Sequence, residues 1–284
     1  MKSIIVIPNI QKDSELNITK KVIKKLCELD LCVYVEEKHS SDLTNINVYR
    51  EPPHDAELIV VIGGDGSVID ASSLAVELDI PLLGINLGKV GYLATVDPEE
   101  IELLSRVATE EFNITDKMLL SVEKHSADGK KTLGSRLALN DVVISHESYL
   151  GISNFKVENA CGDHVQYRAD GVIISTPAGS TAYALSAGGP IISHTLDSIM
   201  VTPICPHSFF NRAIVYGPEE EIRITNVTDT KMNVSLDGRF FSSLENGDYC
   251  VITKSEKRFK MINFGKSNIF SSLSKKIKLL HDSI

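Results

Sequence analysis

The sequence predicts two domains: an α/β domain over residues 1–116 and an all-β, sandwich-like domain over residues 117–265. Two observations lead to this fold class. Up to about Asp116, apolar runs alternate with amphipathic segments of helical period, which is typical of a parallel sheet covered by helices. Beyond that point apolar and polar residues alternate with period two between turn dipeptides, which is typical of antiparallel sheets.

The elements of the first domain follow from these patterns in chain order. We expect strands at 3–9 (SIIVIPN), 32–37 (CVYVEE), 57–63 and 80–88 (IPLLGINLG). Helical spacing of apolar residues predicts helices from Leu16 to Leu29 and from about Val68 to Leu78. A third helix is expected to begin with Asp97 as its N-cap and Pro98 at its first position.

The second domain is predicted from short alternating segments, among them FKVEN, EIRITNV, KMNVSLDG and YCVITKS. The dipeptides Asp128-Gly129 and Asn246-Gly247 are typical of hairpin turns, and Asp237-Gly238 predicts a further turn. The final segment, 266–284, spaces its apolar residues along one helical face. It predicts a C-terminal helix that packs back on the first domain.

Composition excludes several classes of protein. The chain has 284 residues, of which 43% are hydrophobic and 24% charged, which suits a globular protein with a substantial core. Its net charge of −9 argues against sequence-independent binding of nucleic acid. No apolar run is long enough to span a membrane, and the N-terminus lacks the features of a signal peptide. The five cysteines form no C-x-x-C pair, so we expect reduced thiols and a cytoplasmic protein.

The glycine loop Gly63-Gly64-Asp65-Gly66-Ser67 lies between a predicted strand and a predicted helix. It is neither a P-loop, because no Gly-Lys-Ser/Thr follows, nor a dinucleotide fingerprint, because Ile69 stands at the third glycine position. One interpretation is a tight turn with Asp65 or Ser67 as N-cap. The other is a phosphoryl-transfer site, where Asp65 accepts a hydroxyl proton or faces a metal while backbone amides hold phosphate.

The segment Ala169–Pro190, ADGVIISTPAGSTAYALSAGGP, is the second candidate site. Four small residues, Gly179 to Ala182, precede Tyr183 and would allow a ligand to lie against the backbone, with the tyrosine ring beside it. A plain loop between two strands explains the same composition. The pair Asn140-Asp141 can bind a nucleobase edge and a ribose diol, or can form a turn at the end of a strand. His207 is more typical of a structural histidine than of a catalyst.

Together these segments resemble the NAD kinase family. The resemblance runs through GGDGS, NLGKVGYLATV, LND, YRADGVIISTPAGSTAYALSAGGP, TPICPHSFFNR and LDG, and thus over most of the chain. It implies an α/β nucleotide-binding domain, an all-β domain and a C-terminal helix that returns to the first domain. It also implies transfer of the γ-phosphoryl group of ATP, or of inorganic polyphosphate, to the adenosine-ribose 2′-hydroxyl of NAD.

The resemblance also implies roles for individual residues. Asp65 would be the catalytic aspartate, and Mg²⁺ or another divalent cation would accompany ATP. The protein would be a homo-oligomer, a tetramer or a dimer, in which Asp170 contacts the nicotinamide side of NAD across a subunit interface. The residues implied in nucleotide binding are Gly66, Tyr92, Leu93, Asn140, Asp141, Arg168, Asp170, Thr181, Ala182, Tyr183 and Ser186.

Some positions depart from the family pattern. Ser67 and Ala178 stand where threonine is usual, Tyr92 where phenylalanine is usual, Asp141 where glutamate is frequent, and Ala213 where proline is usual. These departures bear on affinity more than on the reaction. Two alternatives stay open: another kinase with a glycine loop of this kind, such as a lipid kinase or a phosphofructokinase, and a non-catalytic dinucleotide-binding regulator.

Overall fold

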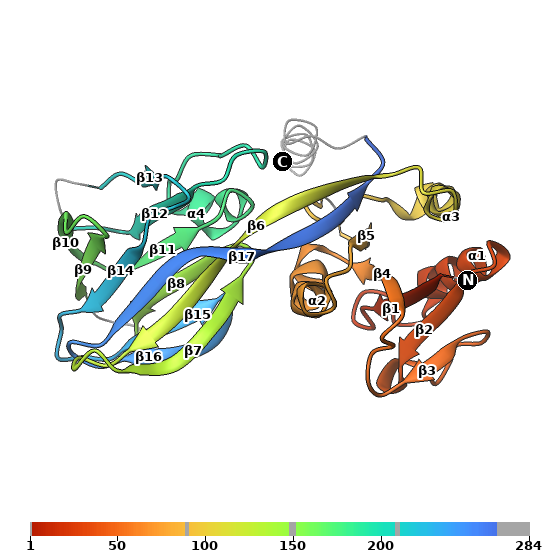
Figure 1. Ribbon diagram of the computed structural model, residues 1–284, viewed down its shortest axis with the longest axis horizontal. Coiled ribbons are helices and arrows are strands. Elements are labelled where there is room, and N and C mark those ends of the chain that lie inside the picture. The colour runs from red at the N-terminus through yellow and green to blue at the C-terminus, as the bar shows by residue number, and fades with distance from the viewer. Residues whose placement is uncertain (1, 89–90, 148–151, 208–210, 266–284) are drawn as a thin grey trace, which may run out of the picture. The chain divides into compact units, whose positions relative to one another are not determined.

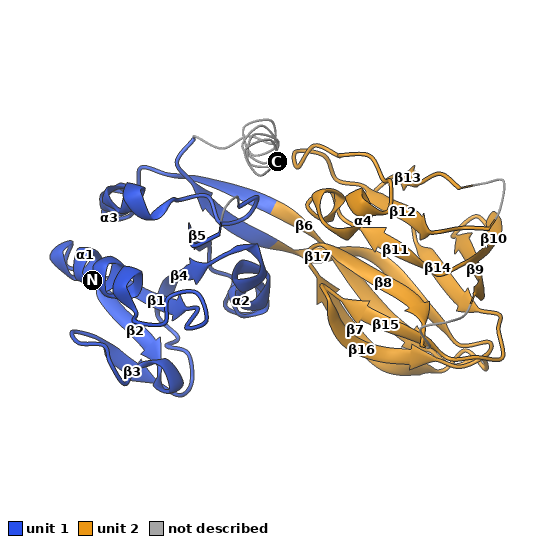
Figure 2. Cartoon of the chain, turned by 180° about the vertical axis from the view of Figure 1, so that it is seen from behind, with its two compact units in different colours: residues 1–116, 259–284 blue, residues 117–258 orange. Residues whose placement is uncertain are grey.

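The structure, a computed structural model, describes residues 2–88, 91–147, 152–207 and 211–265. Two compact units divide the chain: Met1–Asp116 together with the segment that begins at Phe259, and Lys117–Arg258 (Figure 2). We call them unit 1 and unit 2. The sequence places the second boundary later, at residue 265. The predicted C-terminal helix, 266–284, lies outside the described residues.

Unit 1 is a parallel sheet with strand order β5-β4-β1-β2-β3 and connecting helices (Figure 1). Its elements are β1 (Ser3–Pro8), α1 (Asn17–Glu28), β2 (Cys32–Glu36), the 3₁₀ helix η1 (Glu37–His39), β3 (Asn47–Tyr49), β4 (Ala56–Gly63), α2 (Asp65–Leu78), β5 (Leu82–Asn86), the 3₁₀ helix η2 (Pro98–Leu104) and α3 (Ser105–Ala108).

Helices cover both faces of this sheet. Successive residues of a strand point to opposite faces, so neighbouring residues of β5 contact different helices. On one face, Leu83 and Ile85 of β5 join the apolar cluster that contains Val22 and Leu26 of α1. On the other face, a Cβ placed on Gly84 would lie 3.0 Å from the Val68 side chain of α2. The central strands therefore consist almost entirely of buried residues, as expected for a parallel sheet.

Unit 2 contains two antiparallel sheets. Its elements are β6 (Asn113–His125), β7 (Lys131–Ala138), β8 (Asp141–His146), β9 (Ser153–Asn159), β10 (His164–Ala169), β11 (Gly171–Ser175), the 3₁₀ helix η3 (Gly179–Thr181), α4 (Tyr183–Ser186), β12 (Ile199–Ile204), β13 (Ile214–Tyr216), β14 (Ile222–Asn226), β15 (Met232–Leu236), β16 (Arg239–Leu244) and β17 (Tyr249–Asn263). Strands β6 and β17 begin in one unit and end in the other.

One sheet of unit 2 has the order β13-β12-β11-β8-β15-β16. The other contains β10, β9, β14 and β17, with β6 paired to β17 and β7 paired to β6. Inward-facing residues of both sheets share one apolar cluster, including Ile144 and Ile174 from the first sheet and Phe155 and Ile224 from the second. This two-layer arrangement is the sandwich expected from the period-two pattern. The predicted fold class, an α/β domain followed by an all-β domain, is confirmed.

Several local predictions are wrong in detail. Helix α2 begins at Asp65, not near Val68, and its N-cap is Gly64 rather than Asp65 or Ser67. The segment after Asp97 begins as the 3₁₀ helix η2, with Pro98 at its first position, and only its last turn is α-helical. The short strand β3 was not expected, because Asn47–Tyr49 carries no alternating apolar pattern.

The turn at Asn246-Gly247 is present but is not a hairpin. Gly247 has φ +82°, yet β16 before it and β17 after it belong to different sheets. The chain therefore uses this turn to cross from one layer of the sandwich to the other.

No helix in the described part of the chain combines the length and apolar character needed to cross a membrane.

Candidate functional site

Three loops meet at the carboxyl edge of the unit 1 sheet, where ligands bind in open α/β sheets. They follow β1, β4 and β5, which are neighbours in the sheet. The Asn9 N–H donates to the Ile62 carbonyl at 2.8 Å, and the Leu87 N–H donates to the Gly63 carbonyl at 2.7 Å. The Asn9 side-chain amide also donates to Ser67 Oγ at 2.7 Å. The glycine loop is thus held from both sides by its neighbours.

Asp65, in the middle of this loop, is bonded to three consecutive backbone N–H groups. Its Oδ2 accepts from Tyr92 at 2.9 Å, and its Oδ1 accepts from Leu93 at 2.9 Å and from Ala94 at 3.1 Å. Leu93 is buried and Tyr92 is half-buried. Tyr92 and Leu93 are among the residues predicted to bind the nucleotide, and in the structure their backbone N–H groups orient the Asp65 carboxylate.

The carboxylate of Asp65 keeps capacity for one more partner. A carboxylate offers about four lone-pair positions, and three N–H groups occupy three of them. Among the described residues Oδ2 accepts a single bond, so the free position belongs to this atom. Asp65 is half-buried and the adjacent Gly66 is exposed, so a ligand can approach here. The geometry therefore suits acceptance of one hydroxyl proton by a carboxylate whose orientation is already set.

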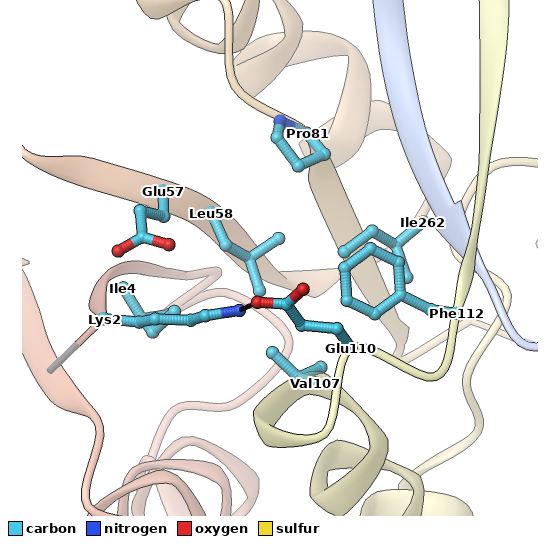
Figure 3. A pocket seen from close by; sticks show the side chains of 9 residues that line it. All are labelled: Lys2, Ile4, Glu57, Leu58, Pro81, Val107, Glu110, Phe112 and Ile262. Atoms are coloured by element: carbon cyan, nitrogen blue, oxygen red, sulfur yellow. Dashed lines mark hydrogen bonds and ion pairs between the residues drawn. The ribbon is translucent and has the colours of Figure 1, made fainter.

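A separate cavity of about 180 Å³ lies at the opposite, amino edge of the same sheet (Figure 3). Leu58 at the start of β4 and Pro81 just before β5 help to line it. Lys2 and Glu110 pair with each other across it at 2.5 Å. Their mutual ion pair leaves few polar atoms for a ligand, and the cavity contains none of the predicted site residues.

In unit 2, Asp237 binds the backbone of the Leu139–Asp141 segment in the same way that Asp65 binds the backbone of Tyr92 to Ala94. Its carboxylate accepts N–H bonds from Leu139 at 2.8 Å, from Asn140 at 2.7 Å and from Asp141 at 3.1 Å. Asp237 and Gly238 both have positive φ, 50° and 78°, and form the two-residue turn between β15 and β16. This turn is of the type that favours Asp-Gly.

The carboxyl groups of Asp141, which is buried, and of Asp237, which is half-buried, interact electrostatically. Burial, and to a smaller extent the nearby charge of Asp237, raise the pKa of Asp141 to about 7. Burial also raises the pKa of Asp237, although the three N–H bonds to its carboxylate oppose that shift. Because like charges repel, the Asp237 carboxylate disfavours ionisation of Asp141, which therefore stays protonated up to about neutral pH.

The segment Thr176–Tyr183 is attached directly to Asn140. The Thr176 N–H donates to the Asn140 carbonyl at 2.9 Å, and Thr176 Oγ1 donates to the Leu139 carbonyl at 2.6 Å. A Cβ on Gly179 would lie 2.0 Å from the Asn140 carbonyl oxygen, so only glycine permits this approach. The structure therefore brings together two predicted parts of the nucleotide site.

Exposure differs among the predicted residues of this segment. Tyr183 is 47% exposed, and Ser186 is also exposed, so both are accessible to a ligand. Ala182 is half-buried. Thr181 is only 8% exposed, and its hydroxyl donates to the Ala178 carbonyl at 3.1 Å. Thr181 thus shapes the turn, whereas the ring of Tyr183 stands at the surface and is not part of the core.

Arg168 and Asp170 lie elsewhere in unit 2. Asp170 precedes β11 and Thr176 follows it, so six residue steps of about 3.3 Å separate them, or about 20 Å along the strand. Arg168 is exposed on β10, and Asp170 is half-buried. The structure does not bring these two residues together with Asn140 and Tyr183 in one chain.

Sequence reasoning missed the orienting role of Asp237. Its Asp-Gly dipeptide predicts a turn, but nothing local indicates that its carboxylate binds a segment 97 residues away. Asp65 and Asp237 both precede a glycine and both accept three consecutive N–H groups. The dipeptide does not identify this role, because Asp128-Gly129 and Asp170-Gly171 share it.

The described residues contain no group of three or more His, Cys, Asp or Glu side chains able to hold a metal ion. Mg²⁺ bound with a nucleotide needs only one or two carboxylates besides the phosphates.

Comparison with known proteins agrees with this architecture. Residues 4–112 match the ATP-NAD kinase N-terminal domain, and residues 139–264 match the ATP-NAD kinase C-terminal domain. The NAD kinase of Natranaerobius thermophilus is 35% identical over 288 residues, which cover 98% of both chains.

Two solved structures are similar in fold. Yeast NADH kinase complexed with NADH aligns with a TM-score of 0.84 at 22% identity, over 96% of this chain and 86% of the other. An NAD kinase from Archaeoglobus fulgidus in complex with ATP aligns with a TM-score of 0.74 at 25% identity, over 97% and 99% of the two chains. From the two domain matches and the full-length relative, we conclude that the chain belongs to the NAD kinase family.

Proposed function

We propose that the protein is an NAD kinase, which transfers the γ-phosphoryl group of ATP to the adenosine-ribose 2′-hydroxyl of NAD and so forms NADP. The observation that carries this proposal is Asp65, a carboxylate with three N–H bonds and one free lone-pair position at a glycine loop. Family membership supports both the nucleotide and the reaction.

In this mechanism Asp65 accepts the proton of the attacking 2′-hydroxyl through Oδ2. Its charge is offset by the N–H groups of Tyr92 to Ala94, and these bonds also prevent the carboxylate from turning away. Phosphoryl transfer depends mainly on positioning and on charge stabilisation, so a well-oriented carboxylate of ordinary basicity suffices. Mg²⁺ bound with ATP beside the Asp65 loop would supply neutralisation of the charge on the phosphates.

NAD is bound by the residues that unit 2 assembles. Asn140 and Asp141 contact the adenosine, and the adenine ring lies beside Tyr183 against the small residues before it. A protonated Asp141 donates a hydrogen bond to a ribose hydroxyl, whereas an ionised Asp141 accepts one. Support for this binding mode comes from the bonds that join Asn140 to Thr176 and to Asp237.

We further infer that the active protein is a homo-oligomer, in which Asp170 and Arg168 serve the NAD site of a neighbouring subunit. The separation of Asp170 from Thr176 along β11 supports this inference. A cytoplasmic location is supported by the cysteines, because all five carry free thiols.

A direct test is to incubate the protein with NAD, Mg²⁺ and either ATP or polyphosphate, and to measure NADP. We expect the protein to form NADP with ATP as the phosphoryl donor. Phosphorylation of fructose 6-phosphate or of a diacylglycerol in place of NAD would instead favour one of the other kinases, and tight NAD binding without turnover would favour a regulator.

A further inference from the structure

Ser175, the last residue of β11, carries a buried hydroxyl group directly before the segment Thr176–Tyr183. The residue is 0% exposed, and its Oγ has no hydrogen-bond partner among the described residues. Polar groups buried this deeply normally have a partner, so an exception directs attention to the neighbour that can supply one.

The register of the sheet makes Asp141 that neighbour. Strand β8 pairs with β11 in the antiparallel direction, and Ser175 lies directly opposite Asp141 (Figure 1). Directly opposite side chains point to the same face, with Cβ atoms about 4.5–5.5 Å apart. Val143 and Ile173, two residues away on the two strands, share one apolar cluster and so identify this face. Rotation about χ1 of Ser175 therefore brings its hydroxyl group within hydrogen-bond reach of the Asp141 carboxyl group.

The Asp141 carboxyl group is 5% exposed with its residue and accepts no hydrogen bond from the described residues. Among those residues, Asp237 is the charged group that acts on it, and the two like charges repel. Asp237 in turn interacts with Arg239 and accepts three backbone N–H bonds. Asp141 thus has a repelling neighbour on the side of β15 and a hydroxyl group that can donate to it on the side of β11.

We propose that Ser175 is a positioning residue for NAD binding: its hydroxyl group donates a hydrogen bond to the Asp141 carboxyl group and fixes the orientation in which that group meets a ribose hydroxyl. This inference rests on the proposed function, because it concerns the same NAD site. Ser175 is fully buried and acts on the ligand only through Asp141. The turn that contains Asp237 fixes the backbone of Asp141 from one side, and Ser175 fixes its side chain from the other.

The test compares Ser175→Ala with Thr202→Val, a matched control. Thr202 is 1% exposed, its Oγ1 also has no hydrogen-bond partner among the described residues, and it lies on the same face but opposite Ile173. For Ser175→Ala we expect NAD affinity at pH 7, measured by calorimetric titration, to fall about 3- to 10-fold, the equivalent of one hydrogen bond. Thr202→Val should bind NAD as the wild type does.

A second measurement, without NAD, reports on the Asp141 carboxyl group itself. A hydroxyl group bonds more strongly to an ionised carboxylate than to a neutral carboxyl, so its removal raises the pKa of Asp141 above about 7. The fall in the free energy of unfolding with rising pH should therefore extend about one pH unit higher in Ser175→Ala, a tenfold change in the ionisation constant. Thr202→Val should leave the pH curve unshifted, and Ser175→Ala should shift nothing in an Asp141→Asn background.

The two measurements separate this inference from the proposed function. If the wild-type protein makes no NADP but Ser175→Ala shifts the pH curve and weakens NAD binding, the proposed function fails and the assignment of Ser175 stands. An unshifted pH curve or an unchanged NAD affinity in Ser175→Ala, or an equal effect in Thr202→Val, would overturn that assignment.

Discussion

The Asp237 carboxylate accepts a hydrogen bond from the Asn140 N–H at 2.7 Å, and through it the turn between β15 and β16 sets the backbone of a predicted NAD-binding segment. The flanking N–H groups of Leu139 and Asp141 bind the same carboxylate. Asp237 is thus a positioning residue, which acts on the ligand through Asn140 and Asp141.

Replacement of Asp237 by Asn tests this role. Asparagine tolerates the positive φ of 50° but loses one of the two acceptor oxygens, so at least one of three N–H groups loses its partner. An unpaired buried donor costs about 1–3 kcal/mol, so we expect NAD affinity to fall about 5- to 150-fold. Asp128→Asn, in the exposed Asp-Gly turn after β6, is the matched control. Equal NAD affinity in both variants would show that Asp237 has only a structural role.

The Asp141–Asp237 pair predicts an unusual pH dependence of stability. The pKa of Asp141 is raised to about 7, so between about pH 4 and pH 7 the folded protein holds a proton that the unfolded chain has lost. The free energy of unfolding should therefore fall as pH rises through this interval. Asp141→Asn should remove much of this slope, whereas Asp42→Asn, at an exposed position, should retain it. Chemical denaturation between pH 4.5 and 8, followed by circular dichroism, makes the comparison. Parallel pH curves for wild type and Asp141→Asn would contradict the prediction.

Tyr183 is expected to bind NAD through its ring. Stacking of a base on an aromatic ring contributes roughly 1–3 kcal/mol, so Tyr183→Ala should weaken NAD binding by about 5- to 150-fold. Tyr183→Phe keeps the ring and should change affinity much less. Because Tyr183 is 47% exposed, neither change should lower the melting temperature appreciably. Calorimetric titration beside a melting curve is the measurement, and an unaltered NAD affinity in Tyr183→Ala would remove this residue from the site.

Asp170 tests the proposed assembly. If it serves a neighbouring subunit, Asp65→Asn and Asp170→Asn should each be nearly inactive, and a mixture of the two should recover activity once subunits exchange. The recovery arises because some mixed sites combine an intact Asp65 from one chain with an intact Asp170 from another. Sedimentation of the wild type should show a dimer or a tetramer. A fully active monomer would refute the assembly.

The sequence predicts the fold well because local pattern determines most of it. Alternating apolar residues and helical spacing are properties of neighbouring residues, and they locate β1, α1, β4 and β5 nearly at their observed bounds. Local pattern does not predict which strands pair when they lie far apart in the sequence. Asn246-Gly247 correctly predicts a turn, but only the tertiary structure decides that the strands beside it enter different sheets.

The same distinction applies to the site. Asp65, Asn140 and Tyr183 lie in unusual local sequences, and the resemblance to a family assigns them roles. Asp237 lies in ordinary sequence, and its role comes from the segment that the fold places beside it. In the same way, the Asn9 N–H reaches the Ile62 carbonyl only because β1 and β4 pair in parallel, with Pro8 opposite Ile62.

The most direct test of the account is the rate of NADP formation by the wild-type protein and by Asp65→Asn, with NAD and Mg-ATP. Asparagine removes the proton acceptor and cannot accept all three N–H bonds, so melting temperature and NAD affinity are measured in parallel. We expect NADP from the wild type, and a kcat lower by on the order of 10²-fold or more in a folded variant that still binds NAD. Absence of NADP with the wild type, or a near-normal kcat for Asp65→Asn, would contradict the account.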